Sequence, residues 1–373
     1  MTTTSASAQI QKQGATHESL DYGMSMDALR SRVDTELAQL LDRKLQELPD
    51  AGLAPWIQAL RSFVVEGGKR MRAVFCSVGF RGAGGNPQAA SIHAVAAALE
   101  LLQAFLLIQD DIIDRSELRR GRPALHRQLA AWKRERSDSQ GDTAFGNAIA
   151  LLLSDLCLGW ALELINESVR DPVVAAGVRA CFDRLVTDVN YGQALEMLLM
   201  AERTDSLPRS LCVARYKTAT YTIVGPLQLG AALAGAGPTL HQAYADIGFP
   251  AGEAFQLRDD LLGVFGPPDS TGKSNHDDLR EGKPTALFAL ALQRASHSDR
   301  TRLQALYGRP DLDLQQADEL RGLLQASGAV QVIEAMIDER AQRALSALSQ
   351  APMSRDARDD LAALIQRALY RDR

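Results

Sequence analysis

Apolar residues recur at steps of three and four positions along most of this chain, and this spacing limits its possible folds more than any other feature. The periodic stretches are 29–45, 89–108, 148–165, 173–199 and 320–348. Such a spacing places the apolar side chains on one face of an α-helix. Signals for β-strands, such as β-branched alternation bounded by Asn-Gly or Asp-Gly turns, are nearly absent. The pattern therefore predicts an all-α fold.

Segments rich in glycine and proline separate the periodic stretches, at 84–87, 171–172, 237–238 and 266–268. Gly225-Pro226 instead lies inside an apolar run, where proline kinks a helix more often than it ends one. By typical helix lengths, about ten or more helices follow. Residues 1–25 are polar, small and aperiodic, which predicts a disordered N-terminal tail. We expect residues 26–373 to form a single all-α domain.

The composition excludes several classes of protein. With 46% hydrophobic residues, the 373-residue chain can form a large core and is too apolar to be disordered. Its 41 basic and 46 acidic residues give a net charge of −5, which leaves no overall basic surface for nucleic acid. Cys76, Cys157, Cys181 and Cys212 lie far apart and predict reduced thiols. No secretory signal and no uninterrupted apolar run of about 18 residues is found, so we expect a cytoplasmic protein without a membrane span.

An acidic cluster follows the apolar stretch 101–108. Asp110 and Asp114 are four residues apart, so a helix places both carboxylates on one face, with Asp111 beside them. Three crowded anions are unfavourable unless they share a cation. Mg²⁺ takes oxygen ligands and commonly binds through carboxylates together with substrate phosphates. The cluster indicates a metal site, and the alternative is a solvated acidic turn at a helix end.

A second acidic pair favours the metal site over the solvated turn. Asp259 and Asp260 again follow an apolar helix, with Gln256 three and four residues before them. Two apolar helices that both end in adjacent aspartates are able to face each other and hold metal ions between them. The pocket beneath the ions would then be apolar.

Basic residues accompany both acidic clusters. They are Lys69, Arg70 and Arg72 in GGKRMR, Arg119 and Arg120 after the first cluster, and Lys273 and Lys283 after the second. Cations that recur beside carboxylates indicate a polyanionic ligand bridged by metal. Gly272-Lys273-Ser274 does not fit a nucleotide P-loop, because Pro267 stands where that motif needs glycine and no strand precedes it.

At these residues the chain resembles the trans-isoprenyl diphosphate synthases. The matching segments, in order, are GGKRMR at 67–72, Gln103, DDIID at 110–114, RR at 119–120, YKTA at 216–219, QLRDD at 256–260, TGK at 271–273 and GK at 282–283. The resemblance covers about residues 60–285. It implies a large helical bundle around a central apolar cavity, in which isopentenyl diphosphate condenses with an allylic diphosphate. It also implies a homodimer and three Mg²⁺ ions per active site.

The resemblance also implies the roles of individual residues. The metal ligands would be Asp110, Asp111, Asp114, Asp259 and Asp260. The side chains that bind the two diphosphates would be Lys69, Arg72, Gln103, Arg119, Arg120, Lys217, Lys273 and Lys283. Those near the reacting groups would be Lys217, Thr218 and Gln256. None of the six histidines matches a catalytic position.

Two features leave alternatives open. The family's second motif usually reads DDxxD, but Gly263 stands in place of its third aspartate, so metal binding there would be weaker or use Asp277 or Asp278. Phe105 occupies the position that limits product length in such enzymes, with Leu106 one turn below Asp110, which predicts a twenty-carbon geranylgeranyl product. For Phe105 the alternative is plain core packing. Other possible functions are a farnesyl or longer-chain synthase, a class I terpene cyclase and a non-catalytic subunit of a heteromeric synthase.

Overall fold

The chain folds into an assembly of helices in a computed structural model, which describes residues 26–136, 143–202, 205–266 and 277–370. The first half contains α1 (Met26–Gln46), η1 (Ala51–Leu53), α2 (Ala54–Val65), α3 (Met71–Gly82), α4 (Ala90–Ile113), α5 (Leu125–Arg134) and α6 (Thr143–Ser168). The second half contains α7 (Pro172–Glu202), α8 (Leu207–Val213), η2 (Ala214–Val224), α9 (Gly225–Leu233), α10 (Pro238–Phe265), α12 (Asp277–Glu281), α13 (Ala286–Arg294), α14 (His297–Leu306), α15 (Leu314–Ala326), α16 (Ala329–Gln350) and α17 (Arg355–Leu369).

The all-α prediction is confirmed, with one small addition. Among the described residues the strands are β1 (Leu118–Arg119) and β2 (Arg122–Pro123), which pair antiparallel in a short hairpin after α4. The predicted tail, residues 1–25, lies outside the described residues, so the domain boundary at 25/26 stays a prediction.

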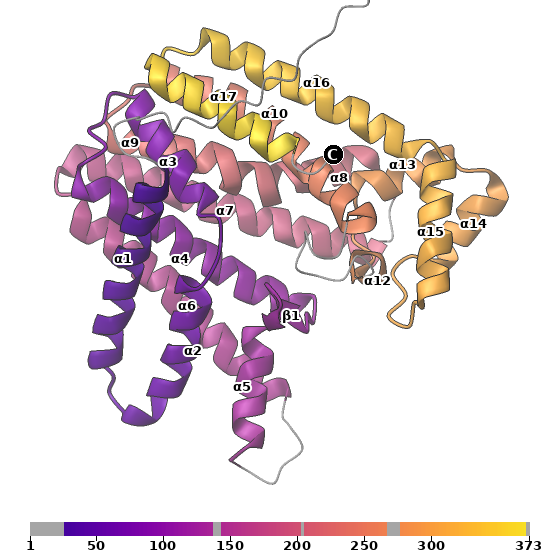
Figure 1. Ribbon diagram of the computed structural model, residues 1–373, viewed down its shortest axis with the longest axis horizontal. Coiled ribbons are helices and arrows are strands. Elements are labelled where there is room, and N and C mark those ends of the chain that lie inside the picture. The colour runs from indigo at the N-terminus through magenta and orange to yellow at the C-terminus, as the bar shows by residue number, and fades with distance from the viewer. Residues whose placement is uncertain (1–25, 137–142, 203–204, 267–276, 371–373) are drawn as a thin grey trace, which may run out of the picture.

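Helix α4 forms the centre of the fold. It is apolar on nearly every side, and its alanines and leucines favour the helix by intrinsic propensity. Helices α3 and α6 pack against it, and η2 lies between α7 and α10. Helices α16 and α17 run along one edge of the molecule, at the top in Figure 1, and α16 packs on α10.

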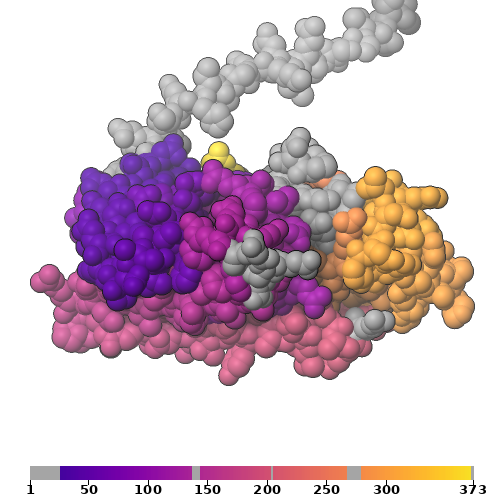
Figure 2. All heavy atoms as spheres, turned by 90° about the horizontal axis from the view of Figure 1, so that it is seen from below, coloured from indigo at the N-terminus to yellow at the C-terminus, as the bar shows by residue number. Residues whose placement is uncertain are grey.

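The two ends of the molecule come from different parts of the chain. In Figure 2 the residues of α1 and α2 form one end, those of α14 and α15 form the other, and pink residues in the colours of α6 and α7 run along one edge. Buried apolar residues from Leu29 to Leu369 nevertheless form one continuous cluster. The site described below therefore rests on a single core.

Two sequence expectations need refinement. The periodic stretch 320–348 is two helices, because the chain turns at Gly328, whose φ of +74° suits glycine. Gly225-Pro226 interrupts regular helix without ending it: α8, η2 and α9 follow one another without a break, and η2 is a π-helix. Because Pro226 has no N–H, it cannot make the usual helical hydrogen bond, and the wider turns of η2 precede it.

Two described helices, α4 and α6, are long and apolar enough to cross a membrane by length and composition. Length and composition alone are weak evidence for a membrane span, because the core helix of a soluble protein meets the same criteria. Of the most apolar stretch of α4, 78% is buried inside the fold, as in the core helix of a globular protein. Of the corresponding stretch of α6, only 39% is buried.

Candidate active site

The last turn of α4 carries the first acidic cluster, and the hairpin after it brings an arginine back onto the cluster. The Nε of Arg119 donates to Asp111 Oδ1 at 2.9 Å, and its Nη2 lies 3.5 Å from Asp110 Oδ2. Burial alone would lower the pKa of Arg119, but the hydrogen bond and charge of Asp111, with the charges of Asp110 and Asp114, raise it. Arg119 thus neutralises part of the acidic cluster.

Two lysines from distant segments complete the neutralisation. Lys217 Nζ donates to Asp110 Oδ1 at 3.2 Å and also bonds Glu196 on α7. Lys283 Nζ lies 2.8 Å from Asp114 Oδ2. Burial would lower the pKa of each lysine, but the surrounding carboxylates outweigh it and raise both values, that of Lys283 strongly. Both ammonium groups therefore stay charged.

The π-helix η2 places Lys217 and Thr218 in the site because both neighbouring helices approach it closely. A Cβ at Gly192 on α7 would lie 2.3 Å from the backbone nitrogen of Lys217, and one at Gly252 on α10 would lie 2.4 Å from the Cα of Ala219. Both distances are impossible for a real side chain, so each helix presents glycine where η2 passes. π-Helical turns are rare and often occur at functional sites.

The second acidic pair lies on α10 and connects to η2 through an amide. Thr218 Oγ1 lies 2.5 Å from Gln256 Oε1, and Gln256 Nε2 donates to Asp260 Oδ1 at 2.7 Å. Helix α10 continues to Phe265, more than a turn beyond Asp260, so the pair lies within the helix. The amide fixes the orientation of Asp260 relative to Thr218.

Two cavities meet at η2. A cavity of about 100 Å³ is lined by Leu106, Asp110, Lys217, Thr218 and Tyr221, among others. A second, of about 180 Å³, is lined by Glu196, Lys217, Thr218, Gln256, Asp260 and Lys283, among others. Lys217 and Thr218 line both cavities. Asp110 of α4 lines one cavity and Asp260 of α10 lines the other, and the two cavities share these two residues. The metal site predicted from the paired aspartates stays a prediction.

The GGKRMR loop leads from α2 into α3 in an unusual backbone conformation. Gly67, Gly68 and Arg70 have φ values of +85°, +101° and +50°. The Arg70 side chain is buried and bonds Asp34, Glu100 and the carbonyl oxygens of Val64 and Val65. Arg70 therefore anchors the loop.

The other two cations of the loop have different surroundings. Lys69 is exposed, and its carbonyl accepts from Arg30 Nε at 3.2 Å. Arg72 donates to Thr222 Oγ1 at 3.0 Å, with its guanidinium 3.9 Å from the centre of the Tyr221 ring. Arg72 thus lies on the η2 side of the loop, towards the cavity that Tyr221 lines.

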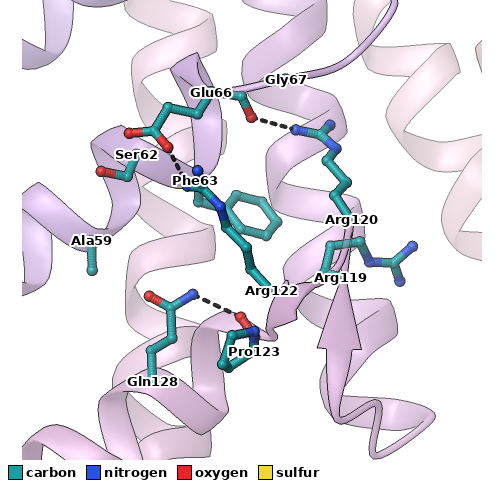
Figure 3. Close-up of a pocket in the computed structure, with 10 residues that line it drawn as sticks. All are labelled: Ala59, Ser62, Phe63, Glu66, Gly67, Arg119, Arg120, Arg122, Pro123 and Gln128. Atoms are coloured by element: carbon teal, nitrogen blue, oxygen red, sulfur yellow. Dashed lines mark hydrogen bonds and ion pairs between the residues drawn. The ribbon is translucent and has the colours of Figure 1, made fainter. Parts of the chain in front are cut away.

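Arg120 turns away from the aspartates and onto this loop. Its Nη1 donates to the Glu66 carbonyl at 3.1 Å, on the rim of a pocket of about 460 Å³ between α2 and the hairpin (Figure 3). Burial and the charges of Arg70, Arg119 and Arg72 lower the pKa of Arg120, against the opposing effect of Glu100. Arginine keeps its proton, so Arg120 adds a positive charge beside those of Arg70, Arg119 and Arg72, which suits an anionic ligand.

The structure places most predicted site residues near one another, but not all. Gln103 lies on α4, about three helical turns before the end of that helix at Ile113, and is half-buried. Leu106 lines the smaller cavity, whereas Phe105 is buried in the core and is not among the described lining residues. Lys273 lies outside the described residues, as do the side chains of Asp277 and Asp278.

Sequence reasoning missed several residues that shape the site, chiefly Glu196 and the anchoring contacts of Arg70. Glu196 is a single acid in an apolar stretch, and its only sequence signal is that isolation. Among the described residues, no group of three or more acidic, histidine or cysteine side chains converges as a metal site does. In this structure each α4 carboxylate instead pairs with a cation: Asp111 with Arg119, Asp110 with Lys217 and Asp114 with Lys283.

Comparisons with known proteins show the family of the chain. The family model described as polyprenyl synthetase matches residues 54–324. A short chain isoprenyl diphosphate synthase of Methanothermobacter thermautotrophicus is 30% identical, over 93% of this chain and 98% of that protein. A geranylfarnesyl diphosphate synthase of Aeropyrum pernix is 32% identical, over 77% of this chain and 84% of its own.

A solved structure is also similar. Geranylgeranyl pyrophosphate synthase from Corynebacterium glutamicum, complexed with isoprenyl diphosphate and magnesium, superposes with a TM-score of 0.89 and is 37% identical, covering 93% of this chain and 100% of that one. Fold and site together define an all-α enzyme of the isoprenoid synthase class. The chain belongs to the polyprenyl synthetase family, and it is a trans-prenyltransferase.

Proposed function

We propose that this prenyltransferase is Mg²⁺-dependent and condenses isopentenyl diphosphate with an allylic diphosphate at the junction of α4, η2 and α10. One observation carries the proposal: Asp110 and Asp260 lie beside cavities that share Lys217 and Thr218. The donors fit the metal, since every proposed ligand is a carboxylate and Mg²⁺ prefers oxygen. The proposed ligands are Asp110, Asp111, Asp114, Asp259 and Asp260, for three ions per active site.

The side chains have distinct tasks in the reaction. Mg²⁺, when bound, would supply neutralising charge for the departing diphosphate oxygens. Lys217, Lys283 and Arg119 bring positive charge to the same place and hold the allylic diphosphate. Lys69, Arg72, Gln103 and Arg120 receive the diphosphate of the second substrate. Lys273 is proposed as a further contact to the allylic group.

The allylic carbon becomes cationic as the diphosphate leaves, and the double bond of isopentenyl diphosphate attacks it. Apolar residues of the smaller cavity, such as Leu106 and Val189, exclude water that would capture the cation. Thr218 lines both cavities and contacts Gln256, which lines the larger one, and the two side chains position the reacting groups. A proton is then lost to the released diphosphate, since no described histidine lines either cavity.

The test is turnover with defined substrates. Purified protein is incubated with Mg²⁺, isopentenyl diphosphate and dimethylallyl, geranyl or farnesyl diphosphate, and the products are analysed by chain length. An elongated diphosphate supports the proposal. A hydrocarbon formed from a single substrate would instead indicate a terpene cyclase. No turnover with any substrate would support a non-catalytic subunit. This alternative is suggested by Gly263, which stands in place of the third aspartate of the second motif.

We further propose a twenty-carbon product, with the bulk of Leu106, which lines the cavity below Asp110, as its limit. The relatives carry both geranylgeranyl and geranylfarnesyl names, so the length must be measured. We expect Leu106→Ala to lengthen the product by removing bulk from the cavity wall. Phe105→Ala should leave product length unchanged and cost about 3–5 kcal/mol of unfolding free energy, because that ring packs in the core.

Product analysis of both variants, together with urea unfolding, checks this prediction. If Phe105→Ala lengthens the product and Leu106→Ala does not, the chain-length limit lies at Phe105, as its sequence position first indicated.

We propose that the enzyme is a cytoplasmic homodimer in which α6 and α7 form the contact between subunits. Leu152 on α6 is 61% exposed and Tyr191 on α7 is 67% exposed, and further large apolar side chains beside them are also exposed. The latter are Leu151, Leu156, Met197 and Leu198. Such an exposed apolar stretch marks a protein or membrane contact. A second copy is the occupant that we infer, because the family resemblance implies a homodimer. The four free thiols are compatible with the reducing cytoplasm.

Charge placed on this face tests the dimer. We expect Leu152→Glu to shift the protein from a dimer to a monomer in analytical ultracentrifugation, since a carboxylate cannot be buried there without a partner. Leu314→Glu, an equally exposed leucine at the start of α15, is the matched control and should leave the mass unchanged. A monomeric parent protein, or a dimer unaffected by Leu152→Glu, contradicts the proposal.

A further inference from the structure

Each cation near the α4 aspartates bonds a carboxylate that the proposed metal would use. The Nζ of Lys217 lies 3.2 Å from Asp110 Oδ1, and the Nζ of Lys283 lies 2.8 Å from Asp114 Oδ2. The Nε of Arg119 lies 2.9 Å from Asp111 Oδ1. The same cations are those expected to hold the allylic diphosphate. When metal takes the aspartates, these contacts must be exchanged for contacts with the diphosphate.

The two lysines also have a second acidic partner outside the aspartate motifs. Lys217 Nζ bonds Glu196, whose side chain is 8% exposed and also accepts from Gln193 Nε2 at 3.3 Å. Lys283 Nζ lies 2.9 Å from Glu281. Neither glutamate belongs to a metal-binding motif, so each is able to remain on its lysine while the aspartate goes to the metal.

Glu196 is well placed for this role. It extends from α7 into the cavity that Asp260, Gln256 and Lys283 line. Gly192, one helical turn before it, lets the backbone of η2 approach α7, so the short distance between Glu196 and Lys217 is built into the backbone. A buried carboxylate is costly unless it is paired, and Lys217 provides that pairing.

We propose that Glu196 is a positioning residue. It keeps Lys217 in the site when Mg²⁺ binds Asp110. In metal-free protein, Glu196 competes with diphosphate for the same lysine. The inference rests on the metal site proposed above. Diphosphate binding thereby depends on metal for two reasons: metal adds positive charge, and it leaves Lys217 with one carboxylate instead of two. A substrate without its metal meets a site whose cations are already paired.

Glu196→Gln tests this inference, because it removes the charge and keeps the shape. Isothermal titration with inorganic diphosphate in EDTA should show binding at least about fivefold tighter than wild type, since one anion that opposes the ligand is gone. With Mg²⁺, kcat/KM for the allylic diphosphate should fall about 10- to 100-fold, as for other residues that orient a ligand group. Glu196→Asp retains the charge and should restore weak metal-free binding and part of the activity.

Glu163→Gln is the matched control, because it removes a part-buried pair with Lys44 at 2.7 Å, between α6 and α1. It should change neither measurement. If Glu196→Gln leaves metal-free diphosphate binding within twofold of wild type, or weakens it, the inference is wrong. Because that titration needs no turnover, an inactive parent protein would overturn the proposed function separately and leave the titration to decide the role of Glu196.

Discussion

Asp110→Asn is expected to lower turnover by about 10³-fold or more, because it removes a carboxylate that would hold the metal on which the leaving group depends. Asp110 lines the smaller cavity, with Lys217 on one oxygen and Arg119 near the other. The amide retains the shape but neither the charge nor the metal affinity. Steady-state kinetics with isopentenyl diphosphate, an allylic diphosphate and saturating Mg²⁺ measures the loss.

The fold should survive this change. Lys217 still bonds Glu196, and Arg119 still bonds Asp111, so no buried cation is left without a partner. We therefore expect a thermal midpoint close to that of wild type, which separates a catalytic effect from unfolding. Asp360→Asn is the matched control, since Asp360 is a similarly part-buried aspartate on α17 that pairs with Arg81. A variant of Asp110 that retains more than a tenth of wild-type turnover would refute the metal role.

The helices and the acidic clusters were predictable because they depend on local spacing. A period of three and four residues fixes which side of a helix is apolar, and Asp110 and Asp114 share a face for the same reason. The split of 320–348 was not predictable, since a glycine is tolerated inside a periodic pattern and only the fold shows that the chain turns at Gly328.

The partners of the charged residues could not be predicted, because they come from distant parts of the chain. Lys217 and Asp110 are 107 positions apart, and Lys283 and Asp114 are 169 apart. The π-helical register of η2 also has no clear pattern of its own in the sequence, although Pro226 marks its end. Sequence motifs identified the groups that carry the chemistry, whereas packing determines how they are paired.

The GGKRMR loop shows this most clearly, since three neighbouring cations look alike in the sequence and only two of them were expected to bind ligand. The left-handed backbone at Arg70, with a φ of +50°, turns its side chain into the protein. There its guanidinium donates to Asp34 at 2.8 Å and to two carbonyl oxygens at 2.9 Å. Lysine cannot reproduce these contacts, because it lacks the planar set of donors.

Arg70→Met should therefore destabilise the protein by about 3–5 kcal/mol, the usual cost of leaving one member of a buried ion pair alone. The abandoned partner is Glu100, whose side chain is 2% exposed and lies 3.2 Å from Arg70. Urea unfolding measures the change. Arg302→Met removes a surface pair with Glu319 and should cost no more than about 1 kcal/mol, which makes it the control for burial.

The double variant Arg70→Met/Glu100→Gln separates charge burial from loop anchoring. Neutralising Glu100 should recover a large part of the lost stability, because no unpaired charge then remains in the core. It should not recover function, since the carbonyls of Val64 and Val65 still lack their donor and the loop is no longer held. We expect the KM for isopentenyl diphosphate to stay raised in both variants, with a smaller change in kcat. A double variant as unstable as Arg70→Met would mean that the carbonyl contacts of Arg70, and not its charge, stabilise the fold.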